Sequence, residues 1–276
     1  LARFAGEKIT FGQGMTNDLV GWRAHYENDC VRFSACTDLA REETRIGIPG
    51  GFSLYNALAA LCAVQALGVP LHALAEALQD CTGVKGRCEV VPMQAPFTVI
   101  IDYAHTPDGL KNILSAVGTF ADGRVIALFG CGGDRDKSKR PLMARVAARN
   151  ADFVVLTSDN PRTEDPYAIL RGALPGLLAE RTPFAVIEER RRAIAFALEE
   201  GRAGDVIVLC GKGHETYQEI GTTKYHLDER EVVRECFARE QRKEAAQAAK
   251  ENEHEDHHRL YSELRGIRDH GEISGS

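Results

Sequence analysis

The chain has 276 residues, of which 44% are hydrophobic and 27% are charged, and its formal net charge is −6. This length allows one large or two medium-sized domains with their own cores. The negative charge argues against a broad nucleic-acid-binding surface, because such surfaces are usually basic. The sequence contains no apolar stretch long enough to cross a bilayer and no signal-peptide pattern. We therefore expect no nucleic-acid partner and no membrane span.

The eight cysteines are scattered, and none belongs to a C-x-x-C pair or to a zinc-binding spacing. This usage predicts reduced thiols, mostly buried as small apolar side chains, in a cytoplasmic protein. The chain starts at Leu1, and its opening residues are typical of the interior of a fold. We therefore expect it to be a fragment or a processed chain.

The first part of the chain predicts a small mixed domain. Short strands separated by polar turns are expected at 9–12, 31–37 and 42–50. Helical periodicity predicts helices over 53–67 and 71–80. The turn-rich segment 81–91 follows, and a domain boundary is expected within it.

From about residue 97 the pattern alternates regularly between strands and helices. Strands are expected at 97–104, 124–130, 153–158, 183–188 and 205–210, and helices at 107–120, 139–150, 167–180 and 190–200. These strands are rich in Val, Ile and Leu on both faces, and the helices between them are amphipathic. The pattern predicts an α/β fold with a mostly parallel sheet covered on both sides.

The end of the chain carries little chemical information. Asp228 and Glu231 resemble a capping box that opens a helix at 231–240. The strongly polar residues 239–276 are expected to form a charged helical or disordered tail. The histidine-rich run at 254–258 is better explained by solvated charge than by a metal site.

Right-handed crossovers place the strand-to-helix loops of a parallel sheet at one edge, where ligands bind. The most informative of these loops is DNPRTEDP, residues 159–166. Asp159 can accept from an ammonium group, Asn160 can donate and accept, and Arg162 can grip a carboxylate with two N–H groups. This set suits an amino-acid-like ligand that carries both charges. The alternative is a strand-to-helix turn with an ordinary surface ion pair.

Three further loops are expected at the same edge. In DYAHTPDG, residues 102–109, Asp102 and His105 could contact a nucleotide or a metal-bound water, or the loop could simply cap a helix. In GCGGDRDKSKRP, residues 130–141, glycines let an anion approach the backbone, although no P-loop pattern occurs in the chain. In CGKGHETYQ, residues 210–218, two glycines again permit a close approach beside polar groups.

The motifs DYAHTPD, CGGDRDKSKRP, DNPR and GKGHE, in this order, resemble those of the Mur ligases over roughly residues 1–238. The DNPR form is associated with the members that add meso-2,6-diaminopimelate, and lysine-adding relatives typically lack its arginine. The resemblance implies a C-terminal Rossmann-like domain at residues 88–238. It also implies that residues 1–87 are the last part of a central, ATP-binding domain.

The resemblance also implies roles for individual residues. The nucleotide would be contacted by Asn56, Arg87, Asp102, Tyr103 and His105. Catalytic roles would fall to Arg87 and Asp102. The amino-acid pocket would be lined by Arg135, Asp159, Asn160, Arg162, Gly211 and Glu215, and no residue would be a metal ligand.

The family's chemistry uses ATP and Mg²⁺ to form an acyl phosphate on a UDP-N-acetylmuramoyl dipeptide, which the diaminopimelate amine then attacks. The resemblance implies a monomer acting in peptidoglycan precursor synthesis. One departure is Ser53, which stands where the family pattern has an asparagine and has a shorter reach. The family's P-loop, UDP-binding domain and carbamylated lysine have no counterpart in these 276 residues.

Three interpretations follow. We expect the C-terminal part of a diaminopimelate-adding ligase, lacking the P-loop. The first alternative is a non-catalytic diaminopimelate-binding module or a subunit of a split ligase. The second is a related amide ligase of the folyl or cyanophycin type, which the combination of DNPR and GKGHE disfavours.

We expect the purified chain to hydrolyse no ATP by itself, because phosphoryl transfer needs the groups that a P-loop and its lysine supply. A phosphate-release assay on the pure protein checks this expectation. Sustained hydrolysis above a buffer blank would contradict it.

Overall fold

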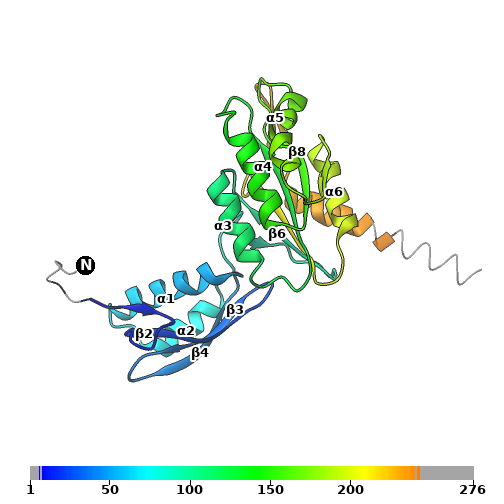
Figure 1. Ribbon diagram of the computed structural model, residues 1–276. Coiled ribbons are helices and arrows are strands. Elements are labelled where there is room, and N and C mark those ends of the chain that lie inside the picture. The colour runs from blue at the N-terminus through cyan, green and yellow to red at the C-terminus, as the bar shows by residue number, and fades with distance from the viewer. Residues whose placement is uncertain (1–5, 7, 240, 243–276) are drawn as a thin grey trace, which may run out of the picture. The chain divides into compact units, whose positions relative to one another are not determined.

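The computed structural model describes residues 6, 8–239 and 241–242 (Figure 1). By its internal contacts the chain divides after Val232 into two units, which are treated separately. Both larger sheets and the candidate site lie in the first unit. No helix in the described part of the chain is long and apolar enough to cross a membrane.

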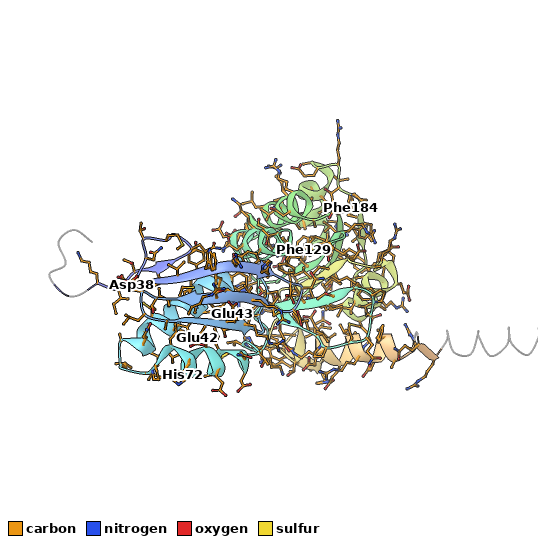
Figure 2. The ribbon with its side chains drawn as sticks, turned by 90° about the horizontal axis from the view of Figure 1, so that it is seen from below. Asp38, Glu42, Glu43, His72, Phe129 and Phe184 are labelled. Carbon is orange, nitrogen blue, oxygen red and sulfur yellow. The ribbon has the colours of Figure 1, made fainter. Side chains whose placement is uncertain are left out.

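The first sheet has four strands in the order β1-β2-β3-β4, and β1 is parallel to β2 while the other pairs are antiparallel. The strands are β1 (Phe11–Gly12), β2 (Leu19–Tyr26), β3 (Val31–Cys36) and β4 (Arg41–Ile46). Helices α1 (Gly51–Gln65) and α2 (Leu71–Gln79) pack on this sheet around Phe33, Leu54 and Leu58. Polar side chains such as Glu43 and His72 remain exposed (Figure 2).

Strands β3 and β4 and both helices confirm the expected elements, whereas β2 was not predicted. The pairing of β2 with β3 shifts register between Trp22 and His25. Arg23, inside this irregularity, has a φ of 50°. A bulge of this kind breaks the two-residue alternation by which a strand is recognised in a sequence.

The second sheet has six strands in the order β5-β6-β10-β7-β8-β9. Its strands are β5 (Glu89–Val90), β6 (Thr98–Asp102), β7 (Val125–Cys131), β8 (Phe153–Ser158), β9 (Phe184–Val186) and β10 (Val206–Cys210). Only β5 pairs antiparallel, so the prediction of a mostly parallel α/β sheet is confirmed. The short β5 was not predicted.

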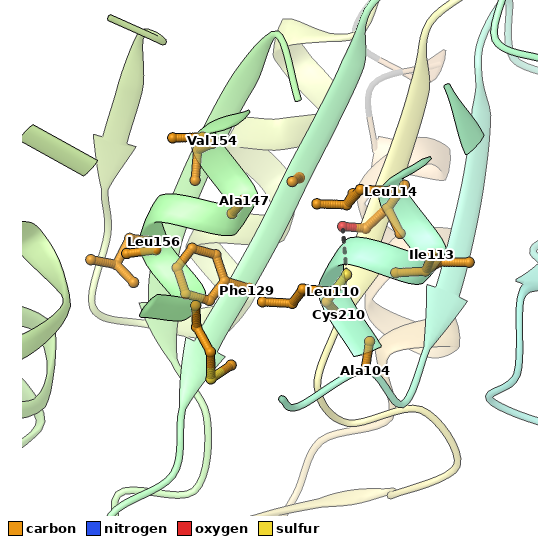
Figure 3. Close-up of a cluster of buried hydrophobic side chains, with 14 of the residues drawn as sticks. Ala104, Leu110, Ile113, Leu114, Phe129, Ala147, Val154, Leu156 and Cys210 are labelled. Carbon is orange, nitrogen blue, oxygen red and sulfur yellow. Dashed lines mark hydrogen bonds between the residues drawn. The ribbon is translucent and has the colours of Figure 1, made fainter. Parts of the chain in front are cut away.

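Helices cover both faces of this sheet, as the buried strands require. One face carries α3 (Pro107–Val117), α4 (Lys139–Asn150) and α5 (Pro166–Leu178), and the other carries α6 (Arg190–Glu200). Between the sheet and α3 and α4, Phe129 packs with apolar side chains from neighbouring strands and helices (Figure 3). Every residue of β7 is buried, because this strand lies inside the sheet.

A short hairpin follows the second sheet and forms a sheet of its own. It pairs β11 (Tyr217–Ile220) with β12 (Thr223–His226) antiparallel. The sequence did not predict this hairpin, whose residues are exposed or only half-buried. Residues 229–239 are helical, while the rest of the expected tail, apart from residues 241 and 242, lies outside the described residues. The domain limits at 87 and 238 stay predictions.

A fully buried arginine joins the ends of two strands beneath the loop edge. The guanidinium of Arg190, at the start of α6, donates to the carbonyl oxygens of Ser158 (3.1 Å) and Cys210 (2.8 Å), which end β8 and β10. Its Nε and Nη2 lie 2.9 and 2.8 Å from Glu229 Oε1. Burial opposes the charge, but the carboxylates of Glu229 and Asp159 outweigh it and raise the pKa of Arg190.

We expect Arg190→Met to lower the free energy of unfolding by about 3–5 kcal/mol, because it leaves the buried Glu229 carboxylate without its partner. Equilibrium urea unfolding measures this loss. The matched control is Arg192→Ala, which removes an exposed pair with Glu189 (2.9 Å) and should lower stability by less than about 1 kcal/mol. Equal losses in the two variants would contradict the assigned importance of the buried pair.

Candidate functional site

A cavity of about 440 Å³ opens at the carboxyl ends of the second sheet's strands. The four loops that the sequence singled out all contribute to it. All six residues predicted for the amino-acid pocket line this cavity, together with two of those predicted for the nucleotide: Arg135, Asp159, Asn160, Arg162, Gly211, Glu215, Tyr103 and His105. The structure therefore brings these residues together, and their roles as ligand contacts stay predictions.

The side-chain amide of Asn160 makes three hydrogen bonds beside the cavity. Its Nδ2 donates to Glu215 Oε2 (2.9 Å), and its Oδ1 accepts from Lys212 Nζ (2.9 Å) and from the backbone N–H of Glu219 (2.9 Å). Asn160 is only 3% exposed. Because both ends of the amide are engaged, Asn160 holds the loop after β8 against the loop after β10.

Lys212 is a buried cation that the sequence analysis did not single out. Its side chain is fully buried, and its ammonium contacts Asn160 and Glu215 Oε2 (3.3 Å). Burial lowers the pKa of Lys212, while the nearby carboxylates of Asp159 and Glu215 act in the opposite direction. The sequence marked Lys212 only by its place inside the GKGHE motif. The motif does not predict that the side chain of this lysine is buried.

Asp159 and Gly211 meet at the floor of the cavity. Gly211 has a φ of +115°, and a Cβ built on it would lie 2.6 Å from Asp159 Oδ2. Asp159 Oδ1 accepts from the N–H of Asn160 at 2.7 Å. A side chain at position 211 would thus push against the carboxylate predicted to receive a ligand ammonium group.

Arg162 is held at several points rather than projecting freely. It has a φ of +51°. Its Nε donates to Glu219 Oε2 (3.1 Å) and its Nη1 to the carbonyl oxygen of Gly133 (2.8 Å). Arg162 thus takes part in an ion pair, but its partner is Glu219 of the distant strand β11 and the pair is partly buried, so it is not the ordinary surface pair of the alternative interpretation.

The glycine-rich loop packs directly on the DNPR loop. A Cβ built on Gly133 would lie 1.8 Å from the carbonyl oxygen of Pro161, so only glycine fits there. The N–H of Gly133 donates to the carbonyl oxygen of Asn160 at 2.9 Å. Arg135, which follows in the same loop, lines the cavity.

A second ion pair ties the same two loops together. The buried Arg140 donates through Nη2 to Glu164 Oε1 (2.8 Å), and this oxygen also accepts from the backbone N–H of Asp134 (2.7 Å). The Arg140 bond, followed by the Asp134 N–H, lowers the pKa of Glu164 to about 2. Neither Arg140 nor Glu164 was a predicted site residue.

The residues predicted for the nucleotide lie in two places. The Arg87 guanidinium lies over the ring of Tyr103 at 5.0 Å. The Tyr103 ring centroid is 4.7 Å from that of His105 and 5.0 Å from that of His214. The exposed guanidinium can contact an anion, and the three rings can stack on a base. His214 was not among the predicted site residues.

Asp102 and Asn56, which were also predicted to contact the nucleotide, do not belong to this group of rings. Both Asp102 oxygens accept backbone N–H groups, Oδ2 from Cys88 and Oδ1 from Ala104, each at 2.8 Å. Asp102 and Arg87 line a second cavity of about 810 Å³ in the first unit, and Asn56 lies exposed on α1 and is not among its lining residues. The helix-capping alternative for this loop holds for Thr106, whose side chain caps α3.

The described residues contain one group of three possible metal ligands close together, Glu27, Asp29 and Cys30, which lines neither cavity. The lining of the two cavities offers an organic ligand charged and aromatic contacts. The lining of the first cavity includes the cations Arg135, Lys139, Arg140 and Arg162 and the carboxylates of Asp136, Asp159 and Glu215. Such a mixed lining can hold a ligand that carries both ammonium and carboxylate groups.

A parallel α/β sheet with polar loops gathered at its carboxyl edge defines a ligand-binding domain. Residues 86–213 match the family described as Mur ligase, glutamate ligase domain. Residues 86–213 thus form a domain of the kind that this family model describes.

The similar proteins agree with this assignment. The chain is 44% identical over 239 residues to the UDP-N-acetylmuramoyl-L-alanyl-D-glutamate–2,6-diaminopimelate ligase of Clostridium botulinum, covering 86% of this chain and 49% of that protein. It is 51% identical over 208 residues to the protein of the same name from Caldanaerobacter subterraneus, covering 75% of this chain and 43% of that protein. The chain thus spans about half the length of these curated relatives.

Solved structures give the same picture. A diaminopimelate ligase of the same name superimposes with a TM-score of 0.70 at 35% identity, covering 84% of this chain and 48% of that one. The alanine ligase MurC from Thermotoga maritima, at 21% identity and a TM-score of 0.57, shares the fold over 86% of this chain and 48% of that one.

The Arg140–Glu164 pair predicts an acid-sensitive site. Because the pKa of Glu164 falls from 4.5 to about 2, its stabilising contribution is complete above 4.5 and is lost as the pH falls toward 2. We expect Glu164→Gln to be less stable than the wild type at about pH 6, with a smaller difference at about pH 3. Thermal unfolding midpoints of both proteins across this range measure the effect. A difference that does not change with pH would contradict it.

Proposed function

We propose that this chain is the amino-acid-binding part of an ATP-dependent ligase that adds meso-2,6-diaminopimelate to UDP-N-acetylmuramoyl-L-alanyl-D-glutamate. The observation that carries this proposal is the meeting of Arg162, Asp159 and Glu215 in one cavity, each from a loop with a ligase-like motif. The names of the similar proteins support the same substrate.

The charges of the cavity fit the proposed ligand. Diaminopimelate differs from lysine by a second carboxylate, and Arg162 offers that carboxylate a charged partner. Asp159 and Glu215 can accept from its ammonium group, and Arg135 can meet its other carboxylate. Losing the arginine–carboxylate contact in a sheltered pocket costs on the order of 2–5 kcal/mol, enough to separate the two amino acids.

ATP is the second proposed ligand. We propose that ATP is contacted by Arg87, Tyr103 and His105. An exposed arginine beside aromatic rings suits a nucleotide, because the guanidinium can contact a phosphate and the rings can stack on the base. A related ligase, MurF from Thermotoga maritima, has been solved with ADP. In the proposed reaction ATP phosphorylates the dipeptide's carboxylate, the diaminopimelate amine attacks it, and phosphate leaves. This chain's residues would hold and orient the amine.

Mg²⁺ remains an inference from the family resemblance, because the described residues beside the two cavities include no group of three possible ligands. We also propose a cytoplasmic monomer. The eight cysteines are scattered through the sequence without a C-x-x-C pair or a zinc-binding spacing, which supports a reducing compartment.

Calorimetric titration tests the proposed specificity. We expect the purified chain to bind meso-diaminopimelate at least tenfold more tightly than L-lysine, because only diaminopimelate presents a carboxylate to Arg162. Arg162→Ala should remove this preference. Arg162→Lys should recover only part of it, since an ammonium group lacks the two-pronged geometry.

The matched control is Arg171→Ala, which removes an exposed arginine on α5 whose partner is Asp165 (3.2 Å), the residue that caps this helix. It should bind both amino acids like the wild type. Equal affinity of the wild type for diaminopimelate and lysine would refute the proposed role of Arg162, and binding of neither would refute the proposed pocket.

A further inference from the structure

The β11–β12 hairpin lies beyond the residues that match the family model. It nevertheless contacts three predicted pocket residues, Asp159, Asn160 and Arg162. Gln218 Nε2 donates to the carbonyl oxygen of Asp159 at 2.7 Å. The N–H of Glu219 donates to Asn160 Oδ1 at 2.9 Å. Strand β11 thus runs beside the DNPR loop and binds its first two residues.

The hairpin also fixes the backbone of Arg162 from both sides. The N–H of Arg162 donates to the carbonyl oxygen of Glu219 (3.0 Å), and its carbonyl oxygen accepts from the N–H of Gly221 (2.7 Å). These two bonds make an isolated parallel bridge with Ile220. They hold the left-handed conformation of Arg162, which a non-glycine residue does not keep without support.

The same strand then orients the Arg162 side chain. Glu219 Oε2 takes the Nε–H, and the carbonyl oxygen of Gly133 takes one N–H of Nη1. An arginine has five N–H donors, so three remain, including both donors of Nη2, which makes no hydrogen bond with the described part of the chain. Arg162 lines the cavity with these donors unused.

We infer that Glu219 is a positioning residue for amino-acid selection, which holds the Nε edge of Arg162 so that its remaining donors face the distal carboxylate of the ligand. This inference rests on the proposed function. The side chains of Arg162 and Glu219 are 21% and 28% exposed, so the pair is sheltered enough to be well defined and open enough for a ligand to reach the guanidinium.

A competing role for Glu219 gives a different result. If its carboxylate only neutralised Arg162, removing the charge in any way would strengthen binding of an anionic ligand group. If it positions the guanidinium, the outcome depends on whether an acceptor remains for Nε–H. Glu219→Gln keeps an acceptor oxygen without the charge, and Glu219→Ala removes both.

Calorimetry on the whole 276-residue chain separates these roles through the ratio of diaminopimelate to lysine affinity. We expect Glu219→Ala to lower this ratio about tenfold and Glu219→Gln to keep it within about twofold of the wild type. The affinity for lysine should change little, because lysine lacks the distal carboxylate that Arg162 is proposed to bind. An unchanged ratio in Glu219→Ala, or a raised ratio in both variants, would overturn the inference.

The chain offers a matched control in Glu180. Its side chain is 22% exposed and pairs with Arg149 at 2.8 Å, and neither residue lines the cavity. Glu180→Ala therefore removes a comparable ion pair away from the pocket, and it should leave the affinity ratio unchanged. A drop equal to that of Glu219→Ala would show a general loss of stability and overturn the inference.

The wild-type titration decides the proposed function, and the variants decide the role of Glu219. A ligand-free measurement adds an independent test, the NMR signal of the Arg162 Nε–H. This N–H should be protected from exchange with solvent in the wild type and in Glu219→Gln. The protection should be lost in Glu219→Ala. Equal exchange in all three proteins would overturn the inference even if the wild type selects diaminopimelate.

Discussion

The candidate site depends on the buried guanidinium of Arg190. Two parallel strands, β8 and β10, lie on either side of β7, and this guanidinium donates to the carbonyl oxygen of the last residue of each. The Glu229 carboxylate balances its charge in the same dry environment. The loops that begin at Asp159 and Gly211 therefore leave the sheet from fixed points. The contacts between these two loops start from those fixed points.

Above this anchor the loops are locked to one another by backbone contacts and by buried polar groups. Gly133 lets the glycine-rich loop touch the DNPR loop, and the Asn160 amide bonds to groups from both the GKGHE loop and β11. The buried Lys212 completes this network. Because these groups already have partners, the pocket is organised before any ligand arrives, and binding need not order it.

Two kinds of ligand contact lie near each other within the first unit. The mixed charges around Arg162 suit an amino acid with an extra carboxylate, while Arg87 and the ring of Tyr103 suit a nucleotide. A ligase of the proposed kind needs both ligands close together, because the amine must reach an activated carboxylate. The four loops that line the first cavity share one edge of the sheet, which is compatible with this proposal.

Much of this could be read from the sequence. The repeated apolar strands and amphipathic helices predicted the parallel sheet, and the rule for strand ends predicted that Asp159, Arg135 and Gly211 would meet. The motifs carried the family resemblance. Strand β2 was missed because its register shifts at Trp22, and the β11–β12 hairpin was missed because its polar, exposed residues show no burial pattern.

The sequence by itself thus determined the fold class through local periodicity, and its motifs, through the family resemblance, named eight of the residues that line the first cavity. Only the tertiary structure decided which groups hold that set in place. Glu219 meets Arg162 across 57 residues, Lys212 turns inward to Asn160 across 52, and Arg190 reaches Glu229 across 39. Partners so far apart leave no local pattern, because their contact depends on how the whole sheet brings its loops together.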